Sequence, residues 1–176
     1  MTYVVRPYRP ADAEGLSALF ADYMAETYGG PNRLTPQVLA REHGRSFELT
    51  VAVDGGEVPI AFGAWVMSYD LHNAVSGGHI HDFYVARSAR GRGLAVRLTA
   101  EIARALKARG GVFLSSVVLP DDTARTRLAG RWGVSFTGAQ TYLAPPVFEA
   151  MADLGGAASA RALVRRLQPL QPLQLG

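Results

Sequence analysis

The sequence contains no cysteine among its 176 residues. A chain without thiols forms no disulfides, offers no thiolate to a metal ion, and cannot hold an acyl group on a cysteine. Long apolar runs are absent too, because no stretch approaches the roughly 20 consecutive apolar residues of a membrane-spanning helix. The first ten residues also lack the apolar core of a signal peptide. We therefore expect a cytoplasmic protein that does not insert into a membrane.

Lysine is nearly absent, since Lys107 stands against seventeen arginines, and the net charge is only +3. The forked guanidinium group suits phosphate, so the bias is compatible with an anionic ligand. A general preference for arginine in the composition would give the same count. A nucleic-acid partner is disfavoured, because the net charge is low and the arginines at 87–92 are not interleaved with aromatic residues.

The composition is typical of a globular chain, with 48% hydrophobic and 19% charged residues. A chain of this length can bury a core of its own without disulfides. We expect one domain over residues 1–154. Residues 155–176 are expected to form a tail, with a short helix followed by a flexible end in which prolines prevent further helix.

Hydrophobic periodicity predicts the order of the elements along the chain. Strands that pair side by side are followed by strands that alternate with helices, which indicates an α/β (α+β) fold with a mixed sheet and helices on its faces. Residues 70–78 are expected to form a polar loop. The expected strands are 3–8, 48–54, 58–69, 79–86, 111–119 and 134–144, and the expected helices begin near 11, 35, 93 and 121 and end near 28, 43, 109 and 132.

The stretch from Val85 to Ala95 lies between a strand end and the first turn of a helix. Free N–H groups and the positive end of the helix dipole meet at such a junction, and glycines let the backbone approach a ligand closely. Arg90 and Arg92 add charge there, although either could be a solvated loop residue. A diphosphate fits this loop, while the Gly-Lys-Ser/Thr phosphate loop and the three-glycine dinucleotide spacing are missing.

Residues 90–95, RGRGLA, resemble the R-x-x-G-x-G/A loop of the GCN5-related N-acetyltransferases, the GNAT superfamily. The order of elements is similar from Tyr3 to about Ala144. The resemblance implies a mostly antiparallel sheet of six to seven strands, with acetyl-CoA as acyl donor and no metal. It also implies that the strands beginning at His79 and Val112 splay apart to receive the pantetheine arm. The coenzyme-binding residues that it implies are Phe83, Tyr84 and Val85 for pantetheine, and Arg90, Gly91, Arg92, Gly93, Leu94 and Ala95 for the diphosphate.

The strand HIHDFYV, residues 79–85, resembles the E-D-x-Y-V strand of the polyamine and small-amine acetyltransferase branch. His81 stands where a glutamate commonly acts as base. Histidine titrates near neutral pH and can take a proton from an ammonium group, so His81 is the first candidate for the base and Asp82 the second. His79 is expected to be structural. Strict alternation puts His81 and Asp82 on opposite faces, so they reach one pocket only if the strand bulges.

The usual general acid of many relatives is missing from this sequence. Alignment on Trp132 and Val134 puts Asp122 and Ala129 where those relatives carry an asparagine and an acidic tyrosine. Tyr142 on the last strand, or Tyr84, could replace the acid. A thiolate can also leave without one.

We therefore predict an N-acetyltransferase that moves an acetyl group from acetyl-CoA to a primary amine, with a small amine or polyamine favoured, by direct attack in a ternary complex. The alternative is a catalytically inactive acyl-CoA-binding sensor or assembly module. A metal site at His79 and His81 is disfavoured, because no carboxylate cluster accompanies them. A homodimer is left open. The acceptor side is expected to include Tyr23, Tyr28, Trp65, Tyr69, Asp70 and His72.

Overall fold

The computed structural model describes residues 3–117, 134–136, 140–143 and 145–154. Within these residues one sheet of seven strands has the order β1-β2-β3-β4-β5-β7-β6. Only β4 and β5 run parallel, and every other pair is antiparallel. The mixed, mostly antiparallel sheet of the prediction is confirmed. The strands are β1 (Tyr3–Pro7), β2 (Glu48–Asp54), β3 (Pro59–Asp70), β4 (Val75–Val85), β5 (Leu114–Val117), β6 (Val134–Phe136) and β7 (Gln140–Leu143).

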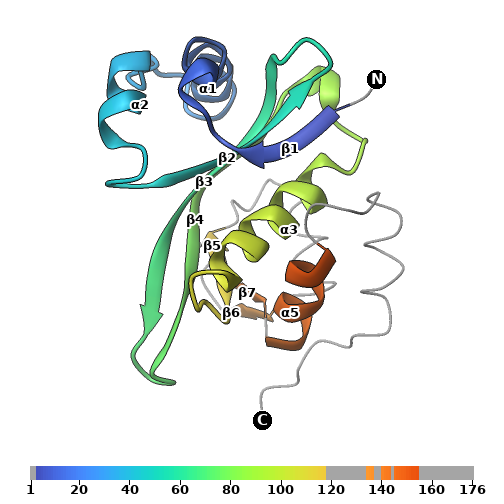
Figure 1. Cartoon of the computed structure of the whole chain (residues 1–176). Coiled ribbons are helices and arrows are strands. Elements are labelled where there is room, and N and C mark those ends of the chain that lie inside the picture. The colour runs from blue at the N-terminus through green and yellow to red at the C-terminus, as the bar shows by residue number, and fades with distance from the viewer. Residues whose placement is uncertain (1–2, 118–133, 137–139, 144, 155–176) are drawn as a thin grey trace.

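Helices cover both faces of the sheet, as predicted (Figure 1). On one face lie α1 (Ala13–Thr27) and α2 (Pro36–Glu42), and on the other lie α3 (Leu94–Lys107) and α5 (Pro145–Leu154). The helix α1 buries Leu16, Leu19 and Tyr23 against the sheet. The helix α3 buries a stripe of residues four positions apart, which consists of Leu94, Leu98, Ile102 and Leu106.

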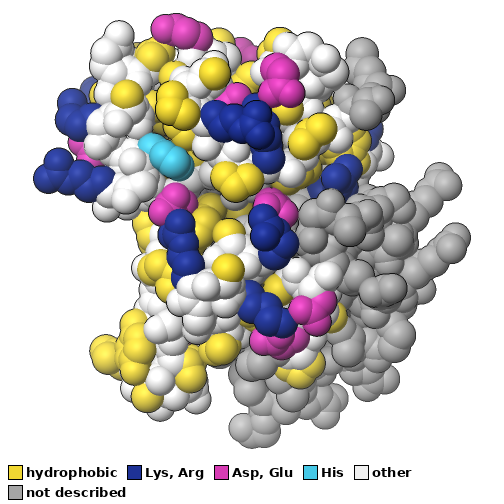
Figure 2. All heavy atoms as spheres, in the orientation of Figure 1, with side chains coloured by type: hydrophobic (Ala, Val, Ile, Leu, Met, Phe, Trp, Pro, Cys, Tyr) yellow, Lys and Arg dark blue, Asp and Glu magenta, His cyan; other side chains and the backbone are white. Residues whose placement is uncertain are grey.

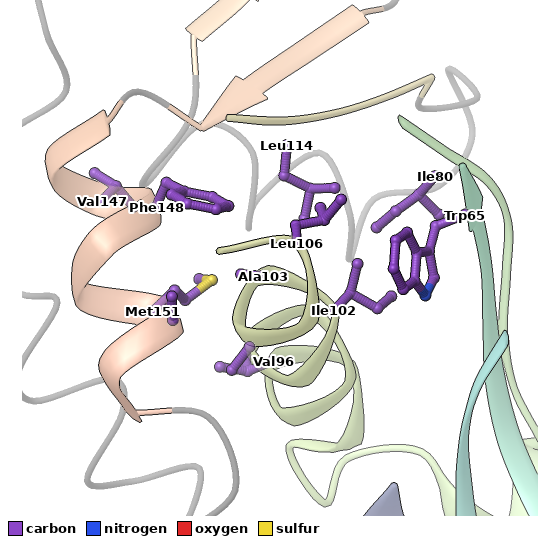
Figure 3. Close-up of a cluster of buried hydrophobic side chains, with 12 residues drawn as sticks. Trp65, Ile80, Val96, Ile102, Ala103, Leu106, Leu114, Val147, Phe148 and Met151 are labelled. Carbon is purple, nitrogen blue, oxygen red and sulfur yellow. The ribbon is translucent and has the colours of Figure 1, made fainter. Parts of the chain in front are cut away.

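The helix α5 extends the core on the α3 side, and the sequence analysis assigned no element to it. Figure 3 shows Phe148 and Met151 directed from α5 toward Ala103 of α3. On its other side α3 packs against the sheet, where Ile102 lies beside Trp65. The helix α5 therefore shares one hydrophobic core with α3 and the sheet.

The predicted loop over 70–78 is too long, because residues 71–74 form the turn and β4 already begins at Val75. Residues 75–78 pair with β3 instead, up to Asp70 opposite Val75. Two glycines make this possible, because a Cβ on Gly77 would overlap Phe113 and one on Gly78 would overlap Leu106.

The single last strand predicted over 134–144 is also wrong. Residues 134–136 and 140–143 form two separate strands, β6 and β7, which pair antiparallel with Ser135 opposite Thr141. The helix predicted over 121–132 and the tail at 155–176 lie outside the described residues.

Charged side chains of opposite sign are interspersed on the face drawn in Figure 2.

Arg6 and Asp12 form a buried ion pair. They are 8% and 4% exposed, and they form hydrogen bonds of 2.7 and 2.9 Å that tie β1 to the start of α1. In the described part of the chain, no helix has the length and apolar character needed to cross a bilayer.

Candidate active site

Strand β4 contains a β-bulge, and the bulged residue is His81. In the register with β3, Asp82 pairs with Ala64 and Ile80 pairs with Trp65, so His81 is the extra residue between them. An extra residue interrupts the alternation of side chains along a strand. The sequence analysis required a bulge for His81 and Asp82 to lie on the same face, and this bulge is present.

The bulge gathers four polar side chains of β4 on the face covered by α1. Ile80 packs in the core on the α3 side, so its neighbour His79 lies on the opposite face. The rings of His79 and His81 are 4.9 Å apart. Beyond the bulge, Asp82 and Tyr84 both form hydrogen bonds with side chains of α1. The two candidate bases, His81 and Asp82, thus share one face.

Two tyrosines from the end of α1 accompany Asp82. The hydroxyl of Tyr23 donates a hydrogen bond of 2.8 Å to Oδ1 of Asp82, and it lies 3.3 Å from the hydroxyl of Tyr28. Burial raises the pKa of Tyr23 well above its ordinary value, and the hydrogen bonds to Tyr28 and Asp82 raise it further, so Tyr23 stays protonated. Tyr28 is 58% exposed. A carboxylate beside an exposed aromatic ring suits a cationic group.

His79 is held by a serine on the neighbouring strand. Its Nδ1 lies 2.9 Å from Oγ of Ser115, which in turn donates to the carbonyl of Gly78 at 3.3 Å. Burial lowers the pKa of His79, and the neighbouring His81 lowers it further, which favours the neutral ring. The register also puts Tyr142 of β7 opposite Ser115, so His79, Ser115 and Tyr142 occupy one row across three strands.

Pairing between the parallel strands β4 and β5 is short. It covers three residue pairs and ends where Ile80 meets Ser116, while β4 continues along β3 to Val85. The ladder ends one residue before the bulge. The splayed strands implied by the resemblance would separate from this point onward.

The glycine loop joins β4 to α3 with two residues in the left-handed region. Gly91 has φ 76° and Gly93, the N-cap of α3, has φ 73°, a conformation that glycine adopts without strain. A Cβ on Gly91 would meet no described atom within 4 Å. In helix geometry the first-turn N–H groups, those of residues 94–96, lack a helical acceptor, which leaves them available to an anion.

The two arginines of the loop fold back onto the protein. Arg90 donates from Nε to the carbonyl of Val85 at 3.0 Å, and Arg92 donates from Nη2 to the carbonyl of Ser88 at 3.0 Å. The hydroxyl of Tyr3 donates to the carbonyl of Arg92 at 2.9 Å. These contacts tie both guanidinium groups to backbone carbonyls of the loop and its flanks.

The expected acceptor-side residues separate into different places. Tyr23 and Tyr28 lie beside Asp82, as described above. Trp65 instead belongs to the core on the α3 side, where its Nε1 donates to Thr50 at 3.2 Å. Among the described residues, no group of three or more His, Cys, Asp or Glu side chains could hold a metal ion.

A family model described as the acetyltransferase (GNAT) family matches residues 15–134. This range contains the bulge, the tyrosines of α1 and the glycine loop. The chain belongs to this family. The resemblance drawn from residues 90–95 is thereby confirmed, and the protein is a GNAT N-acetyltransferase, as predicted.

Solved GNAT structures share the fold. Ribosomal-protein-alanine N-acetyltransferase from Brucella melitensis biovar Abortus 2308 superposes with a TM-score of 0.65 at 18% identity, over 78% of this chain and 95% of that one. Glucosamine-6-phosphate N-acetyltransferase from Arabidopsis thaliana gives 0.61 at 17% identity, over 79% and 97%. A chain of the NatC complex bound to Gag peptide and CoA gives 0.63 at 17% identity, over 82% and 99%. No curated protein sequence matches this chain.

Two residues at this candidate site were not found from the sequence. Ser115 contacts His79 across 36 residues of chain, and Glu26 contacts Tyr84 across 58. Neither residue stands in a recognisable motif. Only the placement of β5 beside β4, and of α1 over β4, brings them to the site.

Proposed function

We propose that this protein transfers the acetyl group of acetyl-CoA to a small primary amine, polyamines included, by direct attack within a complex of both substrates. One observation carries the proposal: the bulge at His81 brings His81 and Asp82 to one face, beside Tyr23 and Tyr28. The glycine loop, which would hold acetyl-CoA, comes directly after the same strand.

The loop fits the diphosphate of coenzyme A. Left-handed glycines at 91 and 93, and the open space beside Gly91, let the backbone approach an anion closely. In this proposal the N–H groups of residues 90–95 bind the diphosphate. Phe83, Tyr84 and Val85 then line the path of the pantetheine arm.

The acceptor amine arrives as an ammonium ion, which the carboxylate of Asp82 and the exposed ring of Tyr28 attract. His81 takes the proton, directly or through a water molecule, because it is the exposed imidazole at the bulge. The free amine then attacks the thioester carbonyl. A backbone N–H of the strand near Phe83 to Val85 stabilises the oxyanion that forms.

Collapse of the tetrahedral intermediate breaks the carbon–sulfur bond, and the sulfur leaves as a thiolate. Tyr142 is the candidate that returns a proton to it, because the register puts Tyr142 in one row with His79 and Ser115. A Tyr142→Phe variant with unchanged kcat would exclude Tyr142 as the acid and leave Tyr84 or departure as an unprotonated thiolate.

The test is titration calorimetry of the protein with acetyl-CoA, followed by thiol release with a panel of polyamines, other small amines and peptides. Binding with release on a small amine is expected. Binding without release on any acceptor would favour an acyl-CoA sensor, and absence of binding would refute the coenzyme site.

Two variants separate the candidate bases. We expect His81→Ala to lower kcat about 10²- to 10³-fold, the range of general base catalysis, with acetyl-CoA binding retained. Asp82→Asn is expected mainly to raise KM for the amine. If Asp82→Asn instead abolishes kcat while His81→Ala retains it, Asp82 is the base.

A further inference from the structure

The carboxylate of Glu26, in the last turn of α1, is held by side chains from two other elements. Tyr84 of β4 donates from its hydroxyl to Oε2 at 2.9 Å. Arg90 of the glycine loop donates from Nη2 to both carboxylate oxygens, at 2.9 and 3.0 Å. The Nε of Arg87, which precedes the loop, lies 3.2 Å from Oε2. One carboxylate thus joins the acceptor-side helix, the strand of the candidate bases and the coenzyme loop.

These contacts form a network and not an isolated surface pair. Single exposed ion pairs contribute little to stability, and Arg87 and Arg90 are 76% and 47% exposed. The side chain of Glu26, however, is only 23% exposed. The hydrogen bonds from Tyr84, Arg90 and Arg87 outweigh the effect of burial and lower the pKa of Glu26 to about 2. The carboxylate is therefore charged whenever the protein is folded near neutral pH.

The network accounts for the conformation of Arg90, the first residue of the motif. Its guanidinium is shared between Glu26 and the carbonyl of Val85, and it lies 5.5 Å from the centre of the Tyr84 ring. These contacts restrain the guanidinium on three sides, and the bond to Val85 ties Arg90 back to the end of β4. The left-handed turn at Gly91 begins at the next residue.

We propose that Glu26 is a positioning residue for the coenzyme loop: through Arg90 it holds the conformation in which the backbone N–H groups after Gly91 can receive the diphosphate. This inference rests on the proposed function, because it takes the loop as the acetyl-CoA site. Glu26 itself does not touch the coenzyme. Its substitution acts on acetyl-CoA binding and leaves the chemical step unaffected.

The experiment compares Glu26→Gln with Glu14→Gln, an exposed residue in the first turn of the same helix. Glutamine keeps the size of the side chain and removes its charge. We expect Glu26→Gln to weaken CoA binding in titration calorimetry about tenfold and to raise KM for acetyl-CoA similarly. The kcat at saturating acetyl-CoA stays within about twofold of the wild type. Glu14→Gln is expected to match the wild type in every measurement.

A double variant tests whether Glu26 acts through Arg90. If it does, Glu26→Gln with Arg90→Gln weakens CoA binding no more than Arg90→Gln alone. Additive losses in the double variant would overturn the proposed route.

Other outcomes are equally distinct. Equal CoA affinity in the wild type and Glu26→Gln overturns this inference alone. A fall in kcat equal to the rise in KM, together with a lower melting temperature, assigns Glu26 a merely structural role and also overturns it. If the wild type itself does not bind CoA, the proposed function fails, and this inference fails with it.

Discussion

The glycine loop can be tested by a pair of matched substitutions, Gly91→Ala and Gly44→Ala. The two glycines have nearly the same conformation, with φ 76° and 75°, and a Cβ at either position would meet nothing within 4 Å. Gly91 lies in the proposed diphosphate loop, while Gly44 lies in the turn between α2 and β2. The pair therefore imposes the same backbone strain at two sites, of which only one is proposed to bind.

The expected cost follows from the backbone. A left-handed alanine costs about 1–2 kcal/mol, and a less flexible unfolded chain returns about 0.4–1 kcal/mol. A net loss near 1 kcal/mol should lower the melting temperature of either variant by about 2–4 °C.

Coenzyme binding should separate the two variants. Calorimetry should show CoA affinity at least about tenfold weaker in Gly91→Ala, because the loop loses its left-handed turn or gains a methyl group at the binding face. Affinity in Gly44→Ala should equal that of the wild type. Equal affinities in both variants would refute the assignment of the loop, whatever their melting temperatures.

Three further predictions concern stability. Asp12→Asn leaves the buried guanidinium of Arg6 with the exposed Glu57 as its remaining carboxylate partner and should lower the free energy of unfolding in urea by about 3 kcal/mol; a loss under about 1 kcal/mol would contradict the contribution of the buried pair. The folded-state pKa of Glu26, about 2, lies below its ordinary value of 4.5, so its stabilisation is full above pH 4.5 and is lost as the pH falls toward 2. The wild type and Glu26→Gln should therefore differ less in free energy of unfolding, measured by urea unfolding at each pH, as the pH falls through that window. A difference that stays constant would contradict the lowered pKa of Glu26. Phe148→Ala should cost about 3–5 kcal/mol, because Phe148 is fully buried between α5 and α3; an unchanged melting temperature would place α5 outside the cooperative domain.

Hydrophobic periodicity predicted an element correctly where contacts between residues close in the sequence determine its structure. The helices α2 and α3 begin within one residue of the predicted starts near 35 and 93, and the strand β2 has the predicted bounds 48–54. In each case the decisive contacts join residues a few positions apart. The glycine loop could be placed for the same reason, because its strand, turn and helix are consecutive.

Periodicity failed where distant partners decide the conformation. Residues 75–78, VSGG, are half glycine, yet they form strand, because β3 supplies the pairing partner and Leu106 of α3 fills the space above Gly78. The helix α5 has apolar residues at helical spacing, but the prolines at 145 and 146 were not recognised as a helix start. Trp65 was expected on the acceptor side. It lies instead in the core on the α3 side of the sheet.

The bulge at His81 was the least predictable feature of the candidate site and the one on which its chemistry depends. The sequence analysis could state only a condition, that His81 and Asp82 share a pocket if the strand bulges. Nothing in HIHDFYV distinguishes a bulged strand from a regular one, because the extra residue is defined by the register of β4 against β3. The core then requires the bulge: Ile80 and Phe83, three residues apart, both pack toward α3, which a regular strand cannot achieve. Burial of these two apolar side chains on one face thus puts His81 and Asp82 together on the other.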